Sequence, residues 1–143
     1  VVQGARAAGV PVWLSVTVDD RDGSRLRSGE TVAEAARIAA GEGAAAVLAN
    51  CSAPEAMARA LEGLAGAGLP FGAYANGFTQ ITADFLKDAP TVDALTARRD
   101  LGPERYAAFA MGWVAGGATI VGGCCEVGPP HIAALAGALR TAG

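Results

Sequence analysis

Four short β-prone runs alternate with segments of helical spacing along the chain, and no hairpin turn joins any two of the runs. The runs are apolar on both faces, as in strands buried within a parallel sheet. Strands without hairpins are joined by right-handed helical crossovers, so the order predicts an α/β fold with parallel strands. The predicted strands are residues 11–18, 44–50, 71–75 and 118–122.

The stretches between these runs have helical start signals. Thr31 is expected to cap one helix, with Glu34 in the capping-box position. Ser52 is expected to cap the next, which has Pro54 in its first turn. The predicted helices are a first stretch ending near residue 9, then 32–41, 54–67, 103–114 and 130–140, with a short helix near 91–98.

Four βα units make half of an eight-fold barrel. A doubly wound open sheet would show the same alternation, but no Gly-x-Gly-x-x-Gly turn follows any predicted strand. The residues with unusual chemistry lie just beyond strand ends, where barrel enzymes place their sites. The pattern therefore favours a half barrel over an open sheet.

Three cysteines carry that unusual chemistry. Cys124 and Cys125 follow one predicted strand on a glycine-rich turn, and Cys51 follows another. In a parallel barrel the ends of these strands share one rim, so the thiols can converge. Zinc favours sulfur ligands, and a catalytic zinc site has three protein ligands and one open position. An odd cysteine count without a signal peptide does not fit a disulfide framework.

The cysteine motifs resemble those of the homocysteine S-methyltransferase family. The matching segments are Asn50-Cys51, Gly122-Gly123-Cys124-Cys125 and Pro130-His131-Ile132, with Trp13-Leu-Ser-Val, Ser28-Gly-Glu, Tyr74-Ala-Asn-Gly and the helix from Tyr106 to Trp113. The resemblance covers essentially the whole chain. It implies that residues 1–143 are the last four βα units of a (β/α)8 TIM-type barrel, with the N-terminal half absent.

The resemblance also implies a function. Family members transfer a methyl group to the thiol of homocysteine to give methionine, and the cysteines matching Cys51, Cys124 and Cys125 bind Zn²⁺, which presents the homocysteine thiolate as nucleophile. The expected partners are small molecules: homocysteine and a methyl donor, which in the family is S-methylmethionine, betaine or a methylated folate. Asn50 is the candidate substrate-binding residue. The sequence departs from the family pattern at Glu126-Val127-Gly128, where Arg or Gly with Thr residues is expected.

A half barrel exposes two strand edges and lacks the inward side chains of the other strands. We therefore expect this fragment to be weakly stable and inactive by itself.

Two other function classes are consistent with parts of the sequence. Gly122 and Gly123 before a helix could donate backbone N–H groups to an anion in a phosphate-binding barrel enzyme. That interpretation leaves Cys51 unexplained. A non-enzymatic zinc-binding or thiol-sensing module, in which Cys124 and Cys125 react with oxidants, is the other alternative.

Several other residues have an ordinary structural explanation. His131 is expected to bond backbone at its helix start rather than bind metal. Trp113 is expected to pack in the core. Tyr74 and Asn76 follow a strand end, where they could face substrate or pack.

Composition and charge exclude several classes of protein. The chain is 52% apolar and 17% charged, unlike a disordered chain. Its 14 acidic and 11 basic residues are scattered, with a net charge of −3 and no basic stripe, so nucleic acid is not an expected partner. No apolar run approaches the roughly 20 residues needed to span a bilayer. We expect one cytoplasmic domain with reduced thiols and no membrane association.

Overall fold

The computed structural model describes residues 1–79 and 95–142. Its strands form one sheet in the order β1-β2-β3-β4, and each neighbouring pair is parallel. The parallel α/β fold predicted from the sequence is therefore confirmed. The strands are β1 (Trp13–Val16), β2 (Ala46–Asn50), β3 (Phe71–Tyr74) and β4 (Ile120–Val121).

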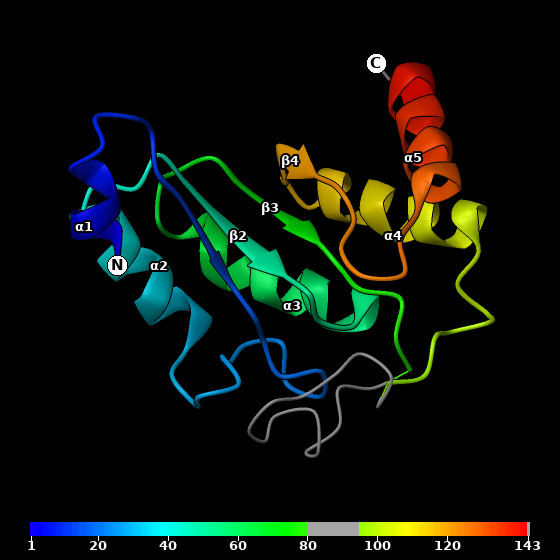
Figure 1. Cartoon of the computed structure of the whole chain (residues 1–143), viewed down its shortest axis with the longest axis horizontal. Helices are drawn as coiled ribbons and strands as arrows, with labels where there is room; N and C mark the ends of the chain where they lie inside the picture. Colours follow the sequence, from blue (N-terminus) through cyan, green and yellow to red (C-terminus); the bar gives the residue numbers. More distant parts are fainter. Residues whose placement is uncertain (80–94, 143) are drawn as a thin grey trace.

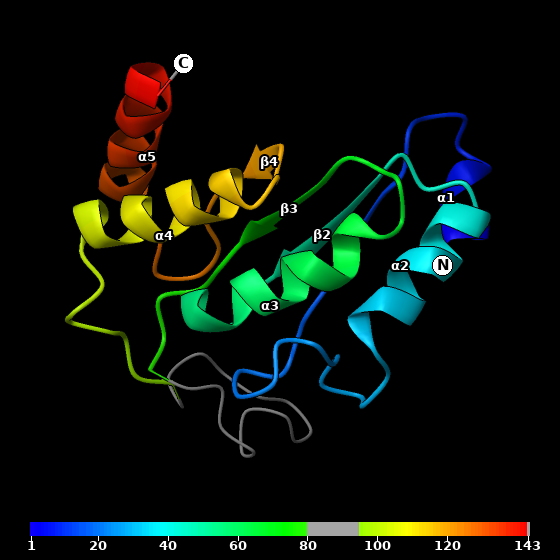
Figure 2. The same ribbon diagram turned by 180° about the vertical axis from the view of Figure 1, so that it is seen from behind.

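Five helices lie in the described part of the chain: α1 (Val2–Arg6), α2 (Val32–Gly41), α3 (Pro54–Ala65), α4 (Pro103–Ala115) and α5 (Pro129–Ala142). Three of them connect consecutive strands and lie on one side of the sheet, while α1 precedes the first strand and α5 follows the last (Figure 1). Helices α2, α3 and α4 lie behind the sheet in Figure 1 and in front of it in Figure 2. Within the described residues no helix covers the opposite face, which we call the open face.

Small residues let the helices approach the sheet closely. Val47 and Ala49 of β2 and Ala73 of β3 point toward the helices and are almost fully buried. Burial of this apolar surface is the main force that holds the two layers together. The helical side of this core is made mostly by Val32, Ala36, Ala39, Met57, Ala60, Leu61, Leu64, Tyr106, Ala110 and Trp113.

The start of α2 is as predicted, and the start of α3 is not. The Thr31 hydroxyl accepts a hydrogen bond from Glu34 N at 3.2 Å and caps α2. The prediction that Ser52 caps α3 is wrong, because Ala53 is the N-cap and makes no side-chain cap bond. The Ser52 side chain is fully buried, and its hydroxyl instead accepts a hydrogen bond from Val18 N at 2.9 Å, just beyond the end of β1. The hydroxyl is therefore not available to cap α3.

Two further expectations concern other parts of the chain. The short helix expected near 91–98 lies mostly outside the described residues, and the described part, 95–98, is not helical. No helix in the described ranges is long and apolar enough to cross a membrane.

Candidate metal centre

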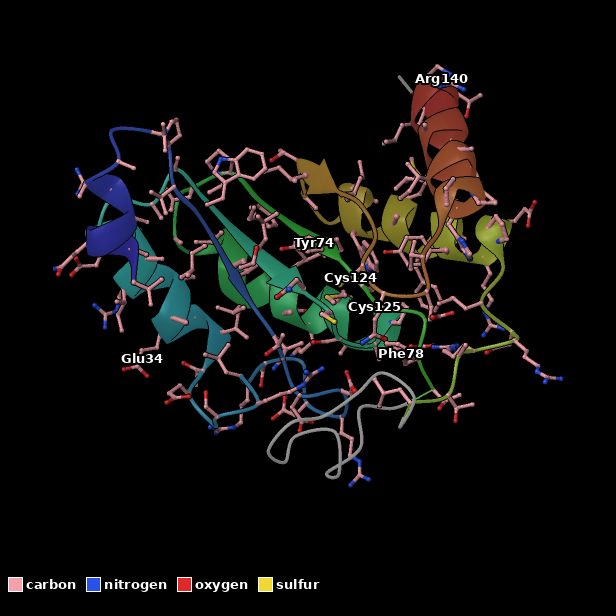
Figure 3. The ribbon with its side chains drawn as sticks, in the orientation of Figure 1. Glu34, Tyr74, Phe78, Cys124, Cys125 and Arg140 are labelled. Carbon is pink, nitrogen blue, oxygen red and sulfur yellow. The ribbon has the colours of Figure 1, made fainter. Side chains whose placement is uncertain are left out.

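The three cysteine side chains converge at the carboxyl end of the sheet. Their sulfur atoms all lie within 4.8 Å of one another. Cys51 Sγ lies 4.0 Å from Cys125 Sγ, and Cys124 Sγ lies 3.8 Å from Cys125 Sγ. Figure 3 shows Cys124 and Cys125 beside the carboxyl end of β2, although they follow β4 in the chain. The structure thus brings together the three residues that the sequence singled out.

The spacing of the thiols fits a shared metal ion. Two sulfur ligands of a tetrahedral zinc lie about 3.8 Å apart, since each Zn–S bond is about 2.3 Å. The distances of 4.0 and 3.8 Å are close to this value. The three cysteines are half-buried or exposed, so a small ligand can reach them. Thiolates are soft ligands that select zinc over magnesium or calcium.

The end of β3 binds the backbone around Cys51 on one side. Cys51 N donates to the Tyr74 carbonyl oxygen at 3.1 Å. Two residues further along, Asn76 N donates to the Ser52 carbonyl oxygen at 3.1 Å. The segment 74–77 therefore continues the β2–β3 pairing beyond the regular strands and fixes the turn that presents the Cys51 thiol.

The same segment binds the other cysteine turn on its opposite side. Cys124 N donates to the Ala75 carbonyl oxygen at 2.9 Å. Gly77 N donates to the Cys125 carbonyl oxygen at 2.8 Å. Because 74–77 lies between the two turns and bonds both, it sets the distance between thiols that are 74 residues apart in sequence.

Both cysteine turns contain a residue with unfavourable backbone geometry. Cys51 has φ 47° and Glu126 has φ 64°, and these are the only residues other than glycine with positive φ in the described ranges. The left-handed region is costly for side chains with a Cβ and persists where the surroundings enforce it. At Cys51 the Arg27 guanidinium donates to its carbonyl oxygen at 2.8 Å, and Asp20 lies 3.8 Å from the same guanidinium.

Two of the thiols, Cys51 and Cys125, have raised pKa values, which favour their neutral form when no cation is present. Burial, and then the neighbouring Cys124 and Cys125 side chains, raise the pKa of the Cys51 thiol to about 12. Burial and the adjacent Cys124 also raise the pKa of Cys125. Crowding three thiolates is unfavourable because like charges repel. A divalent cation between them would reverse this effect, since metal coordination deprotonates a thiol.

Comparison with known proteins identifies the family. A family model described as homocysteine S-methyltransferase matches residues 1–139. The chain belongs to the homocysteine S-methyltransferase family. The resemblance seen in its motifs is therefore confirmed.

A solved relative has the same arrangement of elements. The chain is similar to the homocysteine methyltransferase MmuM from Escherichia coli, in its oxidized form, with a TM-score of 0.67 and 26% sequence identity. The match covers 96% of this chain and 40% of that chain. The chain thus spans less than half the length of the relative. No curated protein sequence matches the chain.

The other candidate residues lie in different places. Asn50 is the half-buried last residue of β2 and is paired in register with Tyr74. The Tyr74 hydroxyl on β3 donates a hydrogen bond to Ser15 Oγ on β1 at 2.6 Å, across the intervening strand β2. A substrate contact for Asn50 stays a prediction.

The side chains of His131 and Asn76 bond backbone atoms outside the two cysteine turns. The His131 Nε2 atom lies 3.0 Å from the Leu101 carbonyl oxygen, so its side chain does bond backbone, but just before α4 and not at the start of its own helix as expected. Asn76 is 1% exposed, and its Oδ1 accepts from Phe78 N at 3.1 Å, a local bond that shapes the turn after β3.

Two residues next to the cysteine turns escaped the sequence analysis. Arg27 bonds the Cys51 carbonyl oxygen, and Tyr106 bonds the Gly122 carbonyl oxygen at 2.6 Å. Both bond backbone atoms of segments that are distant in sequence, so no local sequence motif predicts them. The only sequence signal was the family resemblance, which includes Tyr106 without giving it a role.

Proposed function

We propose that the chain forms the metal-binding and homocysteine-binding half of an enzyme that transfers a methyl group to the thiol of homocysteine, giving methionine. The observation that carries this proposal is the convergence of Cys51, Cys124 and Cys125 at the carboxyl ends of the strands. In this proposal the three cysteines hold Zn²⁺ and leave its fourth position to the substrate sulfur. Zinc bound there would supply the Lewis acidity that deprotonates the homocysteine thiol and keeps it as a thiolate nucleophile beside the methyl donor.

The chain's own residues prepare the site. The backbone bonds from 74–77 hold both cysteine turns in place before any ligand arrives. Such preorganisation lowers the cost of binding. Three thiolates carry one more negative charge than Zn²⁺ neutralises, and the Arg27 guanidinium at the Cys51 carbonyl oxygen places a positive charge next to this excess. We propose Asn50 as a contact for the polar groups of homocysteine, because it ends β2 directly before Cys51.

We further propose that the four strands are the last half of a (β/α)8 barrel, formed by residues 1–143 as one unit. The sheet is parallel with helices on one face, and in the described ranges β1 and β4 each have only one neighbouring strand. In a closed barrel the two edges pair with further strands and the open face lines the interior. Trp13, at 57% exposure on edge strand β1, is an apolar side chain that such closure would cover. The fragment by itself would then lack part of its site and be inactive.

The alternative of a phosphate-binding enzyme is less well supported. Its anion would need free backbone N–H groups in the turn after β4. Gly122 N already donates to the Ala73 carbonyl oxygen at 3.2 Å, and Cys124 N donates to the Ala75 carbonyl oxygen at 2.9 Å. The zinc-binding or thiol-sensing module differs from our proposal in lacking methyl transfer to homocysteine.

Zinc content and methyl transfer test the proposal together. We expect about one zinc per chain in the purified complete enzyme, and loss of both zinc and activity in Cys51→Ala and Cys124→Ser. Thermal unfolding of the metal-free forms would show that these variants remain folded. Activity would be assayed with homocysteine and, in turn, S-methylmethionine, betaine and a methylated folate. A metal-free native enzyme, or a zinc-replete and active Cys124→Ser variant, would overturn the proposal. Zinc binding without methyl transfer from any donor would favour the sensing module.

A further inference from the structure

The pairing of β3 with the chain after β4 is interrupted directly before the cysteine pair. Gly122 N donates to the Ala73 carbonyl oxygen at 3.2 Å. Cys124 N donates to the Ala75 carbonyl oxygen at 2.9 Å. In this parallel register the Ala75 N–H would donate directly to the Gly122 carbonyl oxygen. The Tyr106 hydroxyl takes that place, accepting from Ala75 N at 3.1 Å and donating to Gly122 O at 2.6 Å.

The inserted oxygen holds the two backbones apart at one point of the ladder. A direct N–H···O bond would bring donor and acceptor to about 2.9 Å. Here two bonds in series, of 3.1 and 2.6 Å, span the same gap. The opening lies at Gly122, two residues before Cys124, so it sets the position from which the cysteine turn leaves the sheet. It also explains why β4 is only the two residues Ile120–Val121.

We infer that Tyr106 is a positioning residue for the metal centre: its hydroxyl fixes the separation of β3 from the turn that carries Cys124 and Cys125, and so places these two thiols relative to Cys51. This inference rests on the proposed metal site. Tyr106 does not reach the thiols itself and acts through the backbone.

The surroundings of Tyr106 suit this role. The side chain is fully buried on α4. Its ring meets the rings of Trp113 and His131 edge to face, at centroid distances of 5.9 Å in both cases. His131 is itself anchored by the 3.0 Å contact to the Leu101 carbonyl oxygen. The phenol is therefore held by aromatic packing while its hydroxyl makes the bonds to the two strands.

A phenol is also the right group for the gap. A hydroxyl can accept one hydrogen bond and donate another at the same oxygen, as this position requires. Burial raises the pKa of the Tyr106 phenol above its usual value, so the proton needed for donation to Gly122 stays in place. Phenylalanine would fill the same space without bonding either strand.

The test compares Tyr106→Phe with Val32→Ala in the complete enzyme. The first variant removes only the hydroxyl, and the second shortens a fully buried apolar side chain at the start of α2 that bonds neither cysteine turn. Zinc affinity would be measured by competition with a chromophoric chelator. The geometry of the thiolates would be followed in the Co²⁺-substituted protein, through its thiolate-to-cobalt charge-transfer and d–d absorption bands. All titrations would be made below the onset of thermal unfolding of both variants.

We expect Tyr106→Phe to lower zinc affinity about 10- to 100-fold, as for other residues that orient metal ligands, and to alter the cobalt spectrum. Val32→Ala should lower the melting temperature and leave affinity and spectrum as in the wild type. Wild-type affinity and spectrum in Tyr106→Phe would overturn the inference, as would equal changes in the two variants or unfolding of Tyr106→Phe alone. If the wild-type enzyme itself bound neither zinc nor cobalt, the proposed metal site would have failed instead.

Discussion

Gly77 is the position at which one added methyl group should damage the metal centre most directly. A Cβ atom on Gly77 would lie 2.9 Å from the Cβ of Glu126 and 3.4 Å from its carbonyl oxygen. Carbon atoms pack best at about 3.5–4.0 Å, so in Gly77→Ala the turn from Cys124 to Glu126 must move away by about 0.6–1 Å. Glu126 cannot turn aside easily, because the contact involves its Cβ and backbone and its φ is already 64°.

This movement would be transmitted to the Cys125 thiol. Gly77 N now donates to the Cys125 carbonyl oxygen at 2.8 Å, and a retreat of that size would take the bond beyond the usual limit of about 3.2 Å. Metal–ligand distances tolerate only about 0.2 Å of error. We therefore expect zinc affinity to fall about 10- to 100-fold. Overpacking should also destabilise the metal-free protein by about 1–3 kcal/mol.

Gly112→Ala is the matched control for this substitution. It adds the same methyl group inside α4, where the new Cβ meets no atom within 4 Å apart from its chain neighbours and the backbone of its own helix. The change should stabilise the helix by up to about 1 kcal/mol and leave zinc affinity unchanged. Chelator competition and thermal unfolding of both metal-free variants provide the measurements. Gly77→Ala with wild-type zinc affinity would refute the reasoning that this close contact sets the position of Cys125.

Three further predictions concern the thiols. The pKa values of Cys51 and Cys125 are raised, so zinc must displace both protons near neutral pH, and its affinity should increase at least about 100-fold per pH unit. Chelator competition at several pH values would measure this, and less than a tenfold increase would contradict it. The Cys51 thiol ionises at lower pH in the unfolded chain than in the folded protein. The metal-free protein should therefore lose stability as pH rises from about 9 toward 12. Separately, the metal-free Cys51→Gly variant should be about 0.5–1 kcal/mol more stable than Cys51→Ala, as measured by urea unfolding. Glycine relieves the backbone strain at φ 47°, and the greater entropy of its unfolded chain offsets only part of this gain. Equal stability would show that the Cys51 turn is not strained.

The order and type of the elements could be predicted because hydrophobic periodicity is a local property. The lengths of the strands could not, because pairing depends on distant residues. The run 118–122 is apolar or glycine apart from Thr119, yet regular pairing ends at Val121 where the Tyr106 hydroxyl enters the ladder. The run 11–18 narrows to Trp13–Val16, and Val18 N bonds the Ser52 hydroxyl instead of a strand.

The cysteines of the site could be predicted for a similar reason. Residues that follow parallel strands share one edge of the sheet, so the positions of Cys51 and Cys124 in the chain were enough to place them near each other. Their supporting residues follow no such rule. The Arg27 guanidinium reaches the Cys51 carbonyl oxygen across 24 residues, and the Tyr106 hydroxyl reaches Ala75 across 31. Contacts between a side chain and distant backbone become visible only when the chain is folded.

The unfavourable features of this chain are concentrated around the three thiols. Cys51 and Glu126 adopt left-handed backbone angles, and burial holds the Cys51 thiol in its neutral form. The two backbone angles cost stability in the metal-free protein, and they lie in the turns that carry the converging sulfur atoms. A ligand that binds only the folded state stabilises it by an amount that grows with the logarithm of its concentration. The same residues that weaken the metal-free fold would then couple its stability to zinc, and the melting temperature of the protein should rise steadily with free zinc.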